Sequence, residues 1–194
     1  MGRIHARGWC LGTGGNFSVT LQRDPLRLLM TRSGCDKRAL TPEDLLVVGP
    51  EGLPLQGEAA APSAEARLHA TVARRRSAGS VLHTHSVWGT LLGRHHLAAG
   101  GFAIRDFEML KGLEGVDTHR AEVFVPVVAN SQDMHALARS VERVLTERPE
   151  SHGFLIAGHG LYTWGATLEL AHRHVEIFEF LFECVGRTSD LRRP

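Results

Sequence analysis

Short apolar segments alternate with segments of helical periodicity along the whole chain, and this alternation is the feature that most restricts the fold. The apolar segments are bounded by glycine, proline or other turn residues, which is typical of buried strands. They cover residues 26–30, 45–49, 122–128 and 153–160, together with a strand that ends at His83 and one that follows the glycine-rich loop at 12–19.

Three further segments place apolar side chains on one face of a helix. They lie at residues 63–76, 131–148 and 167–185, and Gly186 is expected to end the last one. Several successive strands are joined by connections too short for a helix, so many strand neighbours should be antiparallel. The pattern predicts an α/β fold in which helices cover the faces of a mixed sheet.

Composition excludes several classes of partner. The 22 lysine and arginine residues nearly balance the 21 acidic residues, and 6% of the chain is aromatic, so no nucleic-acid-binding surface is indicated. No apolar run is long enough for a membrane helix, and the segment "MGRIHARGW" lacks the apolar core of a signal peptide. Cys10, Cys35 and Cys184 lack the spacing of a disulfide framework or a zinc–thiolate site. We expect one domain over residues 1–194, a cytoplasmic location without membrane contact, and a small molecule or a second copy of the chain as partner.

Three histidines follow apolar segments and are candidates for metal ligands. His83 and His85 are separated by one residue at a strand end, so their side chains should point to the same face. His159 also ends an apolar segment, and Gly158 and Gly160 leave space beside it. Three imidazoles leave coordination positions open, which suits a catalytic ion; zinc is favoured, and iron, manganese, cobalt or nickel is allowed. The alternative is that these are half-buried polar residues bonded to backbone groups.

Two acidic residues, Glu65 and Glu108, are candidates for proton transfer. Glu65 lies in the first turn of a predicted helix, where a carboxylate also stabilises the helix dipole. Glu108 lies in "RDFEMLKGL", where it could be a solvated surface charge. Beside an open metal site, either carboxylate could act as an acid or a base. His172 and His174 are two residues apart on the last predicted helix and are expected at the surface.

Donor-rich segments indicate an anion site. Consecutive small residues in "GTGGNFS" and "TRSGCDK" expose backbone N–H groups, and a third donor-rich segment, "PSAE", adds the hydroxyl of Ser63. Turn formation explains the glycines equally well, and neither glycine-containing segment matches a Walker loop or a dinucleotide fingerprint. We therefore expect a small phosphorylated substrate, and the candidate residues are Gly15, Asn16, Ser33, Gly34, Lys37 and Ser63.

The order of these motifs resembles the class II aldolase superfamily over nearly the whole chain. In sequence order they are a "GxGGNxS" loop, "SGxxK", "PSxE", "HTHS" and "GHGxYxWG". The segments "FEMLKGL" and "GHGLYTWG" resemble the branch of the superfamily that dehydrates 5-methylthioribulose 1-phosphate to 2,3-diketo-5-methylthiopentyl 1-phosphate in methionine salvage. The resemblance implies a three-layer α/β/α sandwich around a mixed, mostly antiparallel sheet, and a homotetramer with active sites at subunit interfaces.

The resemblance also implies roles for individual residues. His83, His85 and His159 match the ligands of one catalytic metal ion per subunit, usually Zn²⁺. Glu108 matches the general acid/base of the dehydratases, and Glu65 matches the glutamate that transfers protons in the sugar-phosphate aldolases. Gly15, Asn16, Ser33, Gly34 and Ser63 match the region that binds the substrate phosphate, and Lys37 lies nearby in the sequence.

Other functions remain compatible with parts of the pattern. Another class II sugar-phosphate aldolase, or a pentulose-phosphate 4-epimerase, would keep the same histidines, and only "EMLKG" favours a dehydratase over them. A non-catalytic association domain like the adducin head would have no need for three ligands at strand ends.

Overall fold

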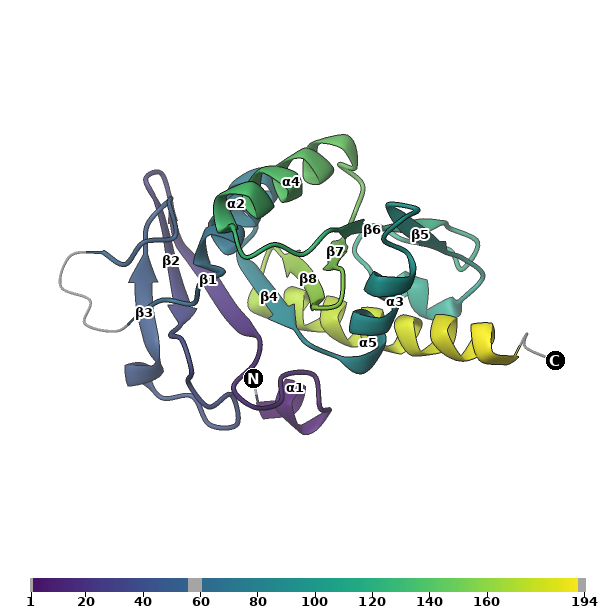
Figure 1. Cartoon of the computed structure of the whole chain (residues 1–194), viewed down its shortest axis with the longest axis horizontal. Helices are drawn as coiled ribbons and strands as arrows, with labels where there is room; N and C mark the ends of the chain where they lie inside the picture. The colour runs from purple at the N-terminus through teal and green to yellow at the C-terminus, as the bar shows by residue number, and fades with distance from the viewer. Residues whose placement is uncertain (1, 56–60, 192–194) are drawn as a thin grey trace.

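The computed structural model describes residues 2–55 and 61–191, and eight strands within them form one sheet (Figure 1). The strands are β1 (Asn16–Arg23), β2 (Leu26–Thr31), β3 (Leu45–Val48), β4 (Ser80–Thr84), β5 (Gly101–Ile104), β6 (Val123–Val128), β7 (Gly153–Ile156) and β8 (Gly160–Gly165). Their order is β3-β2-β1-β4-β8-β7-β6-β5. The pair β6–β7 is parallel and the other described pairs are antiparallel, so the expected mixed, mostly antiparallel sheet is confirmed.

Helices cover both faces of this sheet. They are α1 (Gly2–Ala6), α2 (Ala66–Arg76), α3 (Val87–His95), α4 (Met134–Glu147) and α5 (Leu168–Leu191), with short 3₁₀ helices η1 (Pro42–Asp44) and η2 (Glu108–Gly112). The pair α2 and α4 packs on one face, and the pair α3 and α5 packs on the other (Figure 1). The expected three layers are therefore present. None of the described helices combines the length and the apolar character needed to cross a membrane.

The apolar periodicity of the helices builds two main cores. On α4, the buried residues Leu137, Val141 and Leu145 recur every four positions, and Asp133 caps the helix by accepting from the N–H groups of His135 and Ala136. This face packs with α2 against the sheet, whereas α5 supplies an aromatic core on the opposite face. The sheet is thus buried on both sides, which holds the loops at the ends of its central strands in place.

Two sequence expectations differ from the structure. The apolar segment 153–160 is not one strand, because Gly158 adopts a left-handed conformation (φ +65°) and reverses the chain between β7 and β8. Gly186 does not end the last helix, which continues to Leu191. A Cβ atom at Gly186 would lie 2.2 Å from the Trp88 ring, so glycine at this position makes room for the indole.

Candidate active site

Three histidine side chains converge at one end of the central strands. His83 lies in β4, His85 follows directly after that strand, and His159 lies in the turn between β7 and β8. The Nε2 atoms of His83 and His85 are 2.7 Å apart, those of His85 and His159 are 3.0 Å apart, and those of His83 and His159 are 3.3 Å apart. The pairing of β4 with β8 brings together imidazoles that are far apart in the sequence.

Glu65, at the start of α2, adds a carboxylate to these imidazoles. Its Oε1 atom lies 3.2 Å from Nε2 of His159, and its Oε2 atom lies 3.5 Å from Nε2 of His83. The four ligand atoms of this cluster all lie within 4.8 Å of one another. Oε1 is buried and has no hydrogen-bond partner among the described residues. A carboxylate oxygen and three imidazole nitrogens therefore face the same small volume.

The donor set fits a divalent metal ion. Nδ1 of His83 donates to the carbonyl oxygen of Leu161 over 2.8 Å, so Nε2 presents its lone pair to the cluster. Burial, together with His85 and His159, holds the pKa of His83 well below its usual value, and burial likewise lowers the pKa of His85. Neutral imidazoles are the form that binds metals. Four ligands about 2.0–2.1 Å from one ion would be about 3.3 Å apart, close to the observed spacing, and nitrogen and oxygen donors suit zinc among other divalent ions.

Two glycines allow the backbone to approach this cluster closely. A Cβ atom at Gly160 would lie 1.9 Å from the carbonyl oxygen of Thr84. Gly15 has a φ of +74°, and a Cβ atom there would lie 2.7 Å from the carbonyl oxygen of His83. Any larger residue at either position would displace the strand end that carries His83 and His85.

A hollow of about 270 Å³ opens beside Glu65 and His85, where the glycine-rich loop, the loop after β2 and the start of α2 meet. It is lined by all six candidate anion-binding residues, Gly15, Asn16, Ser33, Gly34, Lys37 and Ser63, and also by Thr13, Gly14 and Arg32. The three donor-rich segments, which are far apart in the sequence, therefore line one hollow in the structure.

Lys37 supplies a buried positive charge to this hollow. The side chain is 2% exposed, and its ammonium group donates to the carbonyl oxygens of Thr13 (3.1 Å) and Cys35 (2.9 Å). An ammonium group has three N–H donors, so one remains for a ligand. Arg32 adds a second cation, although it also pairs with Asp44 over 3.0 Å. This charge pattern suits a phosphate group.

Asn16 connects the hollow with the metal-site carboxylate. Its Nδ2 group donates to Oε2 of Glu65 over 2.6 Å and to Oγ of Ser63 over 3.0 Å. Its Oδ1 atom contacts Nε2 of His69, whose Nδ1 atom lies 2.8 Å from Oγ of Ser18. Both amide hydrogens of Asn16 are thus used within the protein. In this geometry Asn16 orients Glu65 and Ser63, whereas the sequence analysis expected its amide to be free to bind the substrate anion.

Sequence reasoning missed three residues of the site, namely Arg32, His69 and Tyr162. The Tyr162 ring stacks on the ring of His83, with centroids 4.0 Å apart and an interplanar angle of 16°. Burial, reinforced by Glu65, raises the pKa of Tyr162 well above its usual value, so the phenol stays neutral. Its place in the "GHGxYxWG" motif was a usable signal, as was the position of His69 four residues after Glu65 on one helix face.

Glu108 does not join this cluster within the described chain. It begins η2, its side chain is 70% exposed, and its carboxylate pairs with Lys111 over 2.7 Å. The hydrogen bond from Lys111 holds the pKa of Glu108 below its usual value. Glu108 is absent from both the four-residue ligand cluster and the lining of the 270 Å³ hollow. One chain alone therefore supplies Glu65, and not Glu108, as the carboxylate next to the histidines.

The expectation that His174 lies at the surface is wrong. His174 is 2% exposed, and its Nδ1 atom donates to the carbonyl oxygen of Trp164 over 2.7 Å. Its Nε2 atom accepts from the backbone N–H of Glu114 over 3.1 Å. Because α5 packs lengthwise on β8, this helix position faces the sheet, and the backbone satisfies both ring nitrogens.

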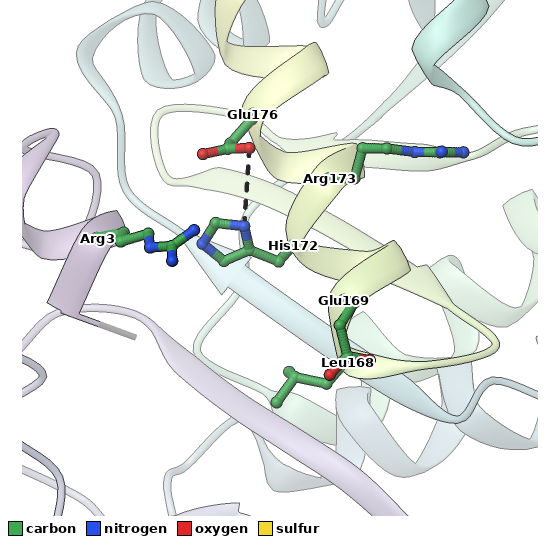
Figure 2. A pocket seen from close by; sticks show the side chains of 6 residues that line it. All are labelled: Arg3, Leu168, Glu169, His172, Arg173 and Glu176. Carbon is green, nitrogen blue, oxygen red and sulfur yellow. Dashed lines mark ion pairs between the residues drawn. The ribbon is translucent and has the colours of Figure 1, made fainter.

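His172 lines a second hollow, of about 550 Å³, between α1 and α5 (Figure 2). Arg3 extends toward His172 from α1, and His172 pairs with Glu176 over 3.8 Å (Figure 2). Charges of both signs line the wall, and none of the candidate catalytic residues reaches it. Although this hollow is larger, the chemistry is concentrated at the histidine cluster.

The fold and the site define a metal-dependent enzyme of the class II aldolase type. The chain belongs to the family described as Class II Aldolase and Adducin N-terminal domain, whose model matches residues 1–185. The superfamily resemblance inferred from the motif order is confirmed.

Curated relatives and solved structures narrow this assignment. A protein of Methylococcus capsulatus named methylthioribulose-1-phosphate dehydratase is 43% identical over 191 residues, covering 98% of this chain and 91% of that protein. A protein of Pectobacterium atrosepticum with the same name is 45% identical over 188 residues, covering 93% of this chain and 87% of that protein. The L-fuculose-1-phosphate aldolase from Thermus thermophilus is similar in structure, with a TM-score of 0.75 and 28% identity, covering 98% of this chain and 92% of that chain.

Proposed function

We propose that this chain is a methylthioribulose-1-phosphate dehydratase. It removes water from 5-methylthioribulose 1-phosphate and yields 2,3-diketo-5-methylthiopentyl 1-phosphate, a step of methionine salvage. The observation that carries the proposal is the four-residue ligand cluster beside a cationic hollow, in a chain that is 43% and 45% identical to two curated enzymes of that name. A phosphorylated sugar does not cross membranes readily, so we place the enzyme in the cytoplasm.

The hollow would hold the substrate phosphate. Lys37 offers its remaining N–H, Ser33 and Ser63 offer hydroxyl groups, and the glycine-rich loop offers backbone N–H groups. Because the phosphate does not react, its contacts serve to hold the reacting carbons beside the histidines, and this lowers the entropic part of the barrier. His83, His85 and His159 would hold the metal ion, with Glu65 as a fourth donor.

The reaction needs one proton to move from C3 to the departing C4 hydroxyl. The C2 ketone acidifies the C3 proton, and Glu108 would accept it as the C3–H bond breaks. Glu108 would then protonate the C4 hydroxyl, so that the C4–O bond breaks, a C3–C4 double bond forms and water leaves. The resulting enol tautomerises to the 2,3-diketone. When bound, a divalent ion supplies Lewis-acid stabilisation for negative charge that develops on the C2 oxygen.

Glu108 would act in the site of a neighbouring copy of the chain. Its carboxylate is exposed and lies outside the hollow of its own chain, which supports this placement. Exposed apolar side chains adjoin the site motifs: Leu11 precedes the glycine-rich loop, Val87 and Leu91 follow His85 on α3, and Met109 follows Glu108. Apolar side chains exposed in this way are typical of an interface between subunits. A homotetramer with its active sites between subunits would satisfy both observations.

Product analysis tests the proposed reaction. The metal-loaded enzyme is incubated with 5-methylthioribulose 1-phosphate, and the products are separated and identified by mass and by ³¹P NMR. The expected product is the diketone phosphate, lighter than the substrate by one water. Aldehyde fragments would replace the dehydratase assignment with an aldolase on the same fold, and a C4 epimer of unchanged mass would replace it with an epimerase.

A further inference from the structure

A buried glutamate on α5 lies directly behind the metal-site strand. Glu179 is 3% exposed, and its Oε1 atom accepts a hydrogen bond from Oγ1 of Thr84 over 3.2 Å. Thr84 directly precedes His85, so this carboxylate binds the neighbour of a proposed metal ligand.

The burial of this carboxylate is not explained by an ion pair. Within residues 2–55 and 61–191, no lysine, arginine or histidine forms an ion pair with Glu179, and its Oε2 atom has no hydrogen-bond partner. Burial raises the pKa of Glu179 to about 7, and the nearby hydroxyls of Ser86 and Thr84 offset only part of that effect. An apolar side chain would cost less at this position, because burying an unpaired carboxylate is unfavourable. The glutamate therefore needs another explanation, and the hydrogen bond that it accepts from Thr84 offers one.

His85 needs such support more than His83 does. His83 lies inside β4, is paired in register with both β1 and β8, and donates its Nδ1 hydrogen to Leu161. His85 lies beyond the end of β4, where its own backbone N–H bonds the carbonyl oxygen of Trp9 over 2.7 Å. In the described part of the chain, no hydrogen bond to Nδ1 of His85 fixes its ring. The position of this imidazole therefore depends on the backbone of residues 84–86.

We propose that Glu179 is a positioning residue that fixes His85 for metal binding, by holding the hydroxyl of Thr84 directly before it. Ser86, on the other side of His85, is the N-cap of α3 and accepts from the N–H of Gly89 over 2.9 Å, so α3 begins directly after this histidine. The proposal rests on the proposed metal site at His83, His85 and His159, and it adds a support on the opposite side of the sheet from α2.

Cobalt binding to four purified variants tests this role. Glu179→Leu removes the acceptor, Glu179→Gln keeps an acceptor oxygen, Thr84→Val removes one donor at similar volume, and Thr84→Ser restores that donor. Glu183→Leu is the matched control, because Glu183 lies one turn further along α5 and pairs with Arg187 at the surface. The readouts are the dissociation constant for Co²⁺ and the visible absorption spectrum of the cobalt-loaded protein, with the urea midpoint as a measure of folding.

We expect Glu179→Leu to weaken cobalt binding by about 10- to 100-fold and to alter the spectrum, since outer partners of metal ligands have effects of that size. The dissociation constants for Co²⁺ of Glu179→Gln, Thr84→Ser and Glu183→Leu should lie within about threefold of the wild-type value. The dissociation constant of Thr84→Val should lie between these values and that of Glu179→Leu. Wild-type affinity and an unchanged spectrum in both Glu179→Leu and Thr84→Val would overturn the proposal. If the wild type itself bound no cobalt, the proposed metal site would be wrong, which is a separate result.

Discussion

Asn16 and Glu65, 49 residues apart in the sequence, are joined by a hydrogen bond of 2.6 Å from the amide of Asn16 to the carboxylate of Glu65. The same amide also donates to Ser63 in the anion hollow. One side chain thus couples the predicted phosphate site to the carboxylate beside the histidines.

Asn16→Ala should lower kcat/KM by about 10- to 100-fold, because a hydrogen bond to a charged acceptor contributes about 1.5–3 kcal/mol. Metal content should be unchanged, since the three histidines remain. Steady-state kinetics and metal analysis check this, with Arg23→Ala at the exposed end of β1 as the control. Normal kcat/KM in Asn16→Ala would mean that Glu65 needs no orientation by Asn16.

Glu108→Gln should keep one metal ion per chain and lower turnover by roughly a hundredfold or more, because the amide cannot transfer the proton. Glu122→Gln is the matched control, since Glu122 is also exposed and also paired with a cation, Arg105. Turnover and metal content of both variants are measured together. Near-normal turnover in Glu108→Gln would remove this residue from the mechanism and leave Glu65 as the acid/base.

A mixture of two inactive variants tests whether sites lie between subunits. If Glu108 acts in a neighbouring copy, co-expressed Glu108→Gln and His159→Ala chains assemble some sites in which both residues are intact. With equal, random mixing, about a quarter of wild-type activity should return. The control is a mixture of His83→Ala and His159→Ala chains. Both histidines of one site come from the same chain, and no chain in this mixture carries both, so this mixture should stay inactive. An inactive first mixture would place Glu108 and the histidines of one site in the same chain.

His159→Ala should lose stoichiometric metal, because it removes one of the three imidazole donors, and the loss of a ligand should weaken binding more than the roughly 10- to 100-fold cost of losing an outer partner. His172→Ala should keep its metal, since His172 lines the separate hollow between α1 and α5. Metal is measured after dialysis against a weak chelator. A His159→Ala protein that still holds one ion per chain would refute the three-ligand site.

Stability should fall in mild acid because of His174. Burial, with smaller contributions from His152 and Arg173, lowers the pKa of His174 from 6.5 to about 4, and its hydrogen bond to Trp164 opposes this shift. Below pH 6.5 the unfolded chain binds a proton that the folded chain rejects, so this stability is present above pH 6.5 and is lost as the pH falls toward 4. The loss from this residue should be about 2 kcal/mol between pH 7.5 and 5.

Urea unfolding of the wild type and of His174→Gln at the two pH values measures this contribution. Glutamine keeps one donor and one acceptor but does not titrate, so its stability should depend less on pH than that of the wild type. His135→Gln, on the exposed side of α4, serves as the control. An equal pH dependence in the wild type and in His174→Gln would show that His174 contributes none of it.

Local patterns were sufficient for some elements and failed for others. Strands β2, β3 and β6 and helix α4 follow from runs and periodicities that each segment carries by itself. Helix α3 was missed because it contains Gly89 and Gly93, which local propensity disfavours. A Cβ atom at Gly93 would lie 3.2 Å from the carbonyl oxygen of Ile156, so glycine there serves close packing of α3 on β7, which a single segment cannot reveal.

The sequence by itself determined the candidate metal ligands, because the two-residue period of a strand puts His83 and His85 on one face and His159 ends an apolar segment between two glycines. It also determined which three segments carry the anion donors. Only the tertiary structure decided how these parts combine: Glu65 next to the histidines, Asn16 between Glu65 and the hollow, His174 buried, and Glu108 exposed on its own chain. The physical reason is that the spacing of side chains along one element is set by local backbone geometry, whereas contacts between distant elements depend on how the sheet orders its strands and on which faces its helices cover.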